Sequence, residues 1–120
     1  MARLLIVEDD ESVRALAARA LERDGHTIDT AADGEEGLDR FVAAQGAYDL
    51  VVSDIRMPGM DGIEMARAAV ARFPSLKILL ITGYAEQRER AAELEGVVVG
   101  VVNKPFTLPQ IRDEIARAMR

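Results

Sequence analysis

The chain has 120 residues, of which 49% are hydrophobic and 30% charged, and its formal net charge at pH 7 is −6. This length predicts one domain with its own core, and the acidic balance argues against a nucleic-acid-binding surface, which needs basic residues. The chain has no cysteine, which excludes disulfides, thiol catalysis and cysteine metal sites. We expect a single cytoplasmic domain over residues 1–120, with no output domain attached.

Short apolar runs alternate with segments of helical periodicity along the whole chain. The runs predict five strands, at residues 4–7, 26–31, 48–53, 78–81 and 97–102. The segments between and after them predict five helices, at about residues 13–24, 35–46, 62–73, 86–95 and 107–119. Such alternation indicates an α/β fold with a parallel sheet and helices on both faces. The expected strand order is 2-1-3-4-5, as in flavodoxin-like folds.

Polar side chains follow four of the five expected strands. Asp9 and Asp10 come after the first strand, Asp54 after the third, Thr82 after the fourth and Lys104 after the fifth. The carboxyl ends of parallel strands meet at one edge of the sheet, where open α/β folds bind ligands. We therefore expect three carboxylates, a hydroxyl and an ammonium to meet in one crevice.

This set of groups predicts a metal site beside a nucleophile. Close carboxylates raise one another's pKa, and a hard cation, Mg²⁺ or Mn²⁺, relieves that repulsion. Asp54 can then stay ionised and attack phosphorus. The metal and Lys104 would neutralise the phosphoryl charge, and Thr82 would donate a hydrogen bond. The backbone carbonyl of Arg56 offers a further metal ligand.

Each of these residues alone also has an ordinary structural explanation. Asp9 and Asp10 suit a helix cap, Asp54 and Thr82 suit turns, and Lys104 suits an exposed loop. Their joint placement at the ends of four strands is what favours a chemical site.

The residues and their spacing resemble the receiver domain of two-component response regulators over the whole chain. The matching segments are Ile6–Asp10, Asp54–Gly62, Thr82 and Lys104–Phe106. The resemblance implies that Asp54 is the phospho-acceptor, and that Asp9 and Asp10 are the metal-site acids, with Asp10 preferred as the direct ligand. It also implies that Thr82 is the switch hydroxyl, that Lys104 contacts the phosphoryl group, and that the peptide bond between Lys104 and Pro105 is cis.

The sequence departs from the family at its usual aromatic switch position, three residues before the lysine, where it has Val101. An aromatic residue, Tyr84, instead stands two positions after Thr82. We expect phosphorylation to draw Thr82 inward and to re-pose the Gly83–Tyr84 loop, which would carry part of the signal. Arg56 and Tyr84 also flank the expected phosphoryl site, and the sequence leaves open whether they shield it from water or orient that water.

The resemblance implies a stand-alone switch that takes its phosphoryl group from a histidine kinase or a histidine phosphotransfer protein. It would catalyse only its own phosphorylation and dephosphorylation. Its output would be protein contact through the fourth helix, the fifth strand and the fifth helix, as a monomer or a weak phosphorylation-dependent dimer, without direct DNA or membrane binding. The stretch Met57–Glu64 and the Thr-Gly-Tyr loop are similar to those of a receiver type that controls a protease.

Three other functions compete with this one. A Mg²⁺-dependent phosphatase with an aspartate nucleophile typically has a second acid two residues later, where this chain has Arg56. A flavodoxin-like cofactor binder would need a phosphate loop rich in Ser, Thr and Gly, and no such loop occurs in the sequence. A degenerate receiver acting only as a scaffold is disfavoured by the complete set of acids and the lysine.

Overall fold

The computed structural model describes residues 2–83, 98–104 and 106–119. Within these ranges the strands are β1 (Arg3–Val7), β2 (Thr27–Ala31), β3 (Leu50–Asp54), β4 (Ile78–Thr82) and β5 (Gly100–Asn103). The helices are α1 (Glu11–Arg23), α2 (Gly34–Ala43), α3 (Gly62–Arg72) and α5 (Leu108–Ala118). The helix expected over 86–95 lies outside the described residues, as do Tyr84 and the peptide bond to Pro105.

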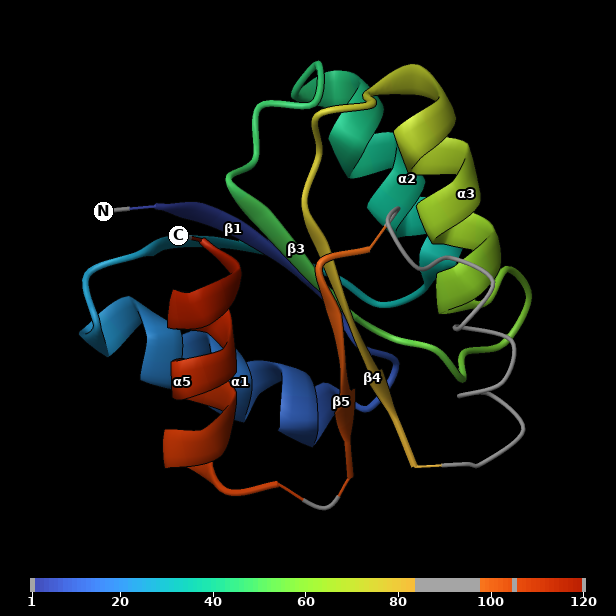
Figure 1. The fold of residues 1–120 in the computed structure, drawn as a ribbon. Helices are drawn as coiled ribbons and strands as arrows, with labels where there is room; N and C mark the ends of the chain where they lie inside the picture. Colours follow the sequence, from blue (N-terminus) through green and yellow to red (C-terminus); the bar gives the residue numbers. More distant parts are fainter. Residues whose placement is uncertain (1, 84–97, 105, 120) are drawn as a thin grey trace.

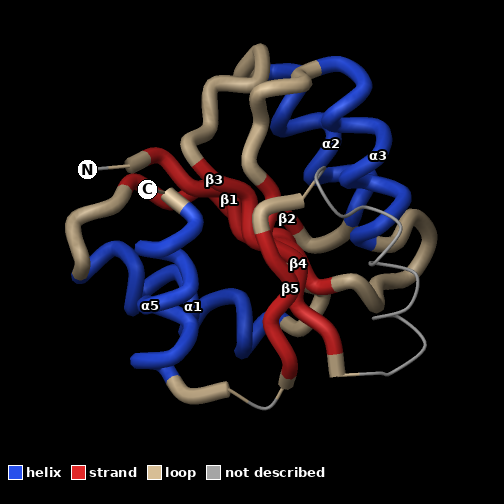
Figure 2. Tube along the Cα trace, in the orientation of Figure 1, coloured by secondary structure: helices blue, strands red, loops and turns tan. Residues whose placement is uncertain are grey.

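The five strands form one parallel sheet in the order β2-β1-β3-β4-β5. This is the predicted order, and Figure 2 shows the strands as the central layer of the molecule. The chain order reverses between β1 and β3, so the carboxyl ends of these two strands open a crevice between the loops that follow them. Each strand differs from its predicted range at one end or both: β3 includes Asp54 itself, β4 includes Thr82, and the largest shift is at β5, which begins at Gly100 rather than at residue 97.

Alternate strand residues build a core on each face of the sheet. Leu5 and Val7 of β1 pack with Phe41 of α2 and Ile63 of α3. Leu4 and Ile6 point the other way, into the core that α1 and α5 cover. Figure 1 shows the two helix layers, α2 and α3 on one face and α1 and α5 on the other. Burial on both faces explains why the central strands contain runs of consecutive apolar residues.

Side-chain caps fix where the helices begin, and thereby where the loops at the crevice end. Asp10 caps α1, since its carboxylate accepts hydrogen bonds from the first helical amides. Asp61 and Glu64 form a capping box at the start of α3, and Thr107 and Gln110 form another at α5.

Candidate functional site

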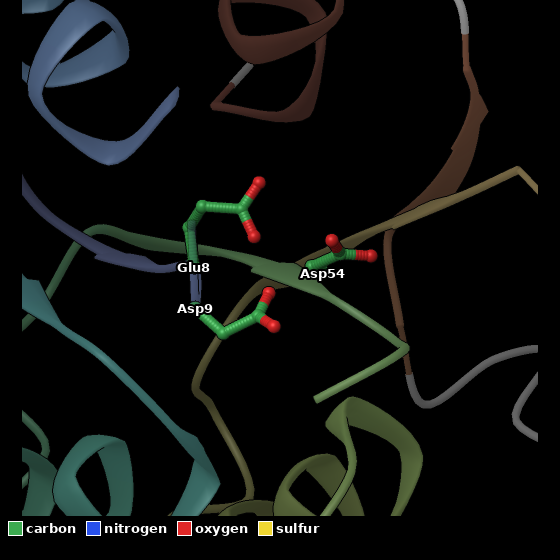
Figure 3. A group of neighbouring side chains, drawn as sticks. All are labelled: Glu8, Asp9 and Asp54. Atoms are coloured by element: carbon green, nitrogen blue, oxygen red, sulfur yellow. The ribbon is translucent and has the colours of Figure 1, made fainter. Parts of the chain in front are cut away.

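Three carboxylates meet at the carboxyl ends of β1 and β3. Asp54 is the last residue of β3, and Glu8 and Asp9 directly follow β1. Because Val7 pairs with Ser53, the next residues along the two strands, Glu8 and Asp54, come to lie beside each other. One carboxylate oxygen from each of Glu8, Asp9 and Asp54 lies within 4.8 Å of the others. Figure 3 shows the side chains of Glu8 and Asp9 extending from the end of β1 on the side where Asp54 lies at the end of β3.

Glu8 is the most perturbed member of this acid cluster, which we define as Glu8, Asp9 and Asp54. The residue is only 6% exposed, and its Oε2 accepts no hydrogen bond from any residue that the structure describes. Burial and the charge of Asp54 raise the pKa of Glu8 to about 7, although Lys104 acts in the opposite direction. A buried acceptor without a donor is costly, and a bound cation would satisfy it. The acid cluster therefore fits a hard metal ion that prefers oxygen ligands.

Lys104 supplies the positive charge of the site. Its Nζ lies 2.8 Å from Oδ2 of Asp54 and 3.7 Å from Oε1 of Glu8. Burial lowers the pKa of the ammonium, but the hydrogen bond and charge of Asp54, with Glu8 and Asp9, outweigh it and raise that pKa overall. The backbone amide of Lys104 donates to the carbonyl of Thr82 at 2.8 Å. This bond ties the lysine to the end of β4, which places its side chain over the acid cluster.

The acid cluster opens into a broad cavity of about 1050 Å³. Besides the three acids and Lys104, its lining includes Arg56, Pro58, Gly83 and Phe106. A carboxylate that lines an open cavity, with a cation beside it, can be reached by a group as large as another protein's side chain. The arrangement can bind a divalent cation and stabilise negative charge that develops on Asp54.

Comparison with known proteins identifies the family. Residues 4–116 match the family model described as the response regulator receiver domain. The chain belongs to this family.

Two curated relatives differ in how much of their length matches this receiver. It is 39% identical over 109 residues to the transcriptional regulatory protein TcrA of Mycobacterium tuberculosis, covering 91% of this chain and 42% of TcrA. It is 34% identical over 119 residues to the response regulator receiver protein CpdR of Brucella abortus, covering 99% of this chain and 98% of CpdR. The receiver thus spans half or less of several curated relatives and nearly the whole of CpdR.

Solved structures agree with this assignment. The response regulator TrrA of Thermotoga maritima, solved in complex with Mg²⁺ and BeF, superposes with a TM-score of 0.86 at 34% identity. The match covers 98% of this chain and 99% of TrrA. The receiver domain of the hybrid histidine kinase CckA superposes with a TM-score of 0.84 at 31% identity over 98% of this chain and 99% of that one. Within the part of this receiver that the structure describes, no helix is long and apolar enough to cross a bilayer.

The acid pair of this receiver differs from the one predicted. The sequence indicated Asp9 and Asp10, with Asp10 as the preferred direct ligand, whereas the structure brings Glu8 into the acid cluster in place of Asp10. Asp10 is exposed, and its Oδ1 accepts from the amides of Ser12 at 2.9 Å and Val13 at 3.1 Å. Its carboxylate is therefore engaged at the start of α1, although the residue still lines the cavity.

Glu8 is the site residue that sequence reasoning missed. A usable signal was present, because Glu8 directly continues a strand that is buried on both faces. Asp10 stands one position before Glu11, where α1 begins, which is the position that favours a capping aspartate.

The other predicted residues lie at the edge of the sheet as expected. Asp54, Thr82 and Lys104 end or follow their strands, and Thr82 is fully buried. Gly83 and Arg56 line the cavity. The roles of Arg56 as a carbonyl ligand and of Thr82 as the switch hydroxyl stay predictions. Val101, which replaces the usual aromatic residue, is half-buried in β5 and packs against the core under α2 and α3.

Proposed function

We propose that this receiver accepts a phosphoryl group on Asp54 from a histidine kinase or a histidine phosphotransfer protein, and signals by changing its protein contacts. The observation that carries the proposal is the arrangement around Asp54. Its carboxylate lies in a cluster with Glu8 and Asp9 and 2.8 Å from the Lys104 ammonium, at an open cavity. These groups are what a phosphoryl acceptor needs, since phosphoryl transfer depends mainly on positioning and charge neutralisation.

The proposed cofactor is Mg²⁺ or Mn²⁺, held by the acid cluster. Such an ion would neutralise charge on the phosphoryl oxygens during transfer. The buried Oε2 of Glu8, which has no hydrogen-bond partner among the described residues, supports the site from this chain itself. TrrA, which is 34% identical to this receiver and whose structure was solved in complex with Mg²⁺ and BeF, supports it from a relative.

The protein groups contribute in distinct ways. A carboxylate oxygen of Asp54 forms the new bond to phosphorus while the bond to the donor histidine nitrogen breaks, and that nitrogen keeps the electron pair. Lys104 already contacts Asp54 and would follow the negative charge onto the phosphoryl oxygens. Thr82 would donate its hydroxyl to one of those oxygens. Arg56, at the cavity wall, would control access of water to the product.

The proposed output is protein contact through the helix expected over 86–95, β5 and α5. CpdR, of which the match covers 98%, is a relative in which the receiver makes up nearly the whole protein, and this supports protein contact as the output. We further propose that this receiver catalyses only its own phosphorylation and dephosphorylation, and that it acts as a monomer or a weak dimer in the cytoplasm. Multiple turnover on a small phosphate ester would instead favour the phosphatase alternative.

The test is a direct measurement of the adduct. The full chain is incubated with Mg²⁺ and a small phosphodonor such as acetyl phosphate, and its intact mass is followed with time. The expected result is one added phosphoryl group, which is absent in Asp54→Asn and strongly reduced when EDTA removes the metal. The absence of any adduct in the wild type, or an unchanged adduct in Asp54→Asn, would overturn the proposal.

A further inference from the structure

Arg14 makes a contact that neither the fold nor the proposed chemistry has so far explained. This half-buried residue lies in the first part of α1, and its Nη1 donates to the backbone carbonyl of Glu8 at 2.8 Å. Side chains of an α-helix lean back towards its N-terminus. The guanidinium of Arg14 therefore reaches past the cap to the residue with which the acid cluster begins.

The peptide bond between Glu8 and Asp9 joins two of the three residues of the acid cluster, so its orientation affects both side chains. The amide of Glu8 donates to the carbonyl of Ala31 at 3.0 Å, so its nitrogen is fixed by β2. Arg14, from α1, donates to the carbonyl of the same residue and holds it in place. Because a peptide bond is planar, holding this carbonyl also sets the direction of the nitrogen and Cα of Asp9. Both side chains are thereby oriented before any ligand arrives.

We propose that Arg14 is a positioning residue for the metal site, which fixes the Glu8–Asp9 peptide so that both carboxylates face Asp54. The inference rests on the proposed function, because it takes the acid cluster to be a working Mg²⁺ site. Arg14 acts only through the backbone of Glu8. Groups outside the first coordination shell that orient ligands commonly change metal affinity by 10- to 100-fold when removed.

Charge and positioning predict opposite effects for the loss of this arginine. Removing a cation near three carboxylates makes the local potential more negative, which would strengthen the binding of a divalent cation. Without the hydrogen bond from Arg14, the Glu8 carbonyl is free to move. The carboxylates of Glu8 and Asp9 would then no longer be held close to Asp54, and the binding of the cation would weaken. The direction of the change therefore distinguishes the two roles.

The experiment measures Mg²⁺ affinity by isothermal titration calorimetry on the full chain. The variants are Arg14→Ala, Arg14→Lys and, as a control of equal charge, Arg19→Ala, which alters an exposed arginine of the same helix. Thermal unfolding in EDTA is recorded for each. We expect about tenfold weaker binding for Arg14→Ala, wild-type binding for Arg19→Ala, and intermediate binding for Arg14→Lys, whose ammonium restores a donor. All variants should keep a cooperative transition without metal.

Three results would overturn the inference. They are binding by Arg14→Ala that equals or exceeds that of the wild type, an equal loss in Arg19→Ala, and loss of cooperative unfolding in Arg14→Ala, which would make its role one in folding. If the wild type bound no Mg²⁺, the proposed function would fail and this inference with it. Wild-type binding with an unaffected Arg14→Ala would overturn the inference alone.

Discussion

Glu8 makes the stability of the metal-free protein depend on pH in a direction that can be calculated. Its pKa rises from 4.5 to about 7 on folding, because the carboxyl is buried beside Asp54. Between these two values the native state binds more protons than the unfolded chain. The contribution of the Glu8 proton to the free energy of unfolding is therefore fully present below pH 4.5 and is lost as the pH rises through about 7.

The size of this effect follows from the same two values. A change from 4.5 to about 7, at about 1.4 kcal/mol for each pH unit, corresponds to an upper limit of about 3 kcal/mol in the free energy of unfolding. About 2 to 3 kcal/mol of it should be lost between pH 5 and pH 8. The substitution Glu8→Gln removes the titrating group and keeps its shape.

The assay is urea unfolding followed by circular dichroism in EDTA, from pH 5 to pH 8. Glu8→Gln and the wild type should have similar stability at pH 5, and the variant should be more stable by about 2 kcal/mol at pH 8. Glu22→Gln, an exposed position on α1, controls for the loss of one negative charge. Saturating Mg²⁺ at pH 8 should favour the wild type, because the metal stabilises the charged form of Glu8. A stability difference between Glu8→Gln and the wild type that did not vary with pH would refute this reasoning.

Three further substitutions test the site, the packing behind it and the cap of α5. Lys104→Met should slow phosphorylation of Asp54 about 100-fold without loss of Mg²⁺ binding, as measured by the mass assay and by calorimetry. Gly62→Ala would place a Cβ 2.4 Å from the carbonyl oxygen of Asp54 and 2.9 Å from Cα of Ile55, so it should cost about 1–3 kcal/mol of stability in urea. Thr107→Ala removes the cap of α5 and should cost about 1 kcal/mol, with phosphorylation unchanged.

The fold was predictable because local patterns and topology agree in this chain. Strands that are buried on both faces stand out as short apolar runs, and helices alternate with them, so the parallel sheet and its order followed from general rules. The ends of elements were less predictable. β5 begins at Gly100, after a run of valines that gives no internal signal of where strand pairing starts.

The site was predictable where one polar residue ends a strand, as at Asp54, Thr82 and Lys104. It was harder to predict in the run Glu8-Asp9-Asp10, where three acids in succession are chemically similar and only their place between β1 and α1 distinguishes them. Which of them joins Asp54 depends on the pairing of Val7 with Ser53 and on where α1 begins, and neither is encoded in the acids themselves. A shift of one residue changes the side chain that faces the cluster.

Lys104 contacts Asp54 through its side chain and lies directly after β5, a strand of the proposed output surface. Above pH 7 the three carboxylates and Lys104 together have a formal charge of −2, which one divalent cation would cancel. In the proposed phosphorylated state, the phosphoryl group on Asp54 would restore negative charge and move the preferred position of the Lys104 ammonium away from Oδ2. Because the backbone amide of Lys104 donates a hydrogen bond to the carbonyl of Thr82, this movement would act at the ends of β4 and β5. Such a route needs no aromatic residue at Val101, which is consistent with the absence of one in this chain.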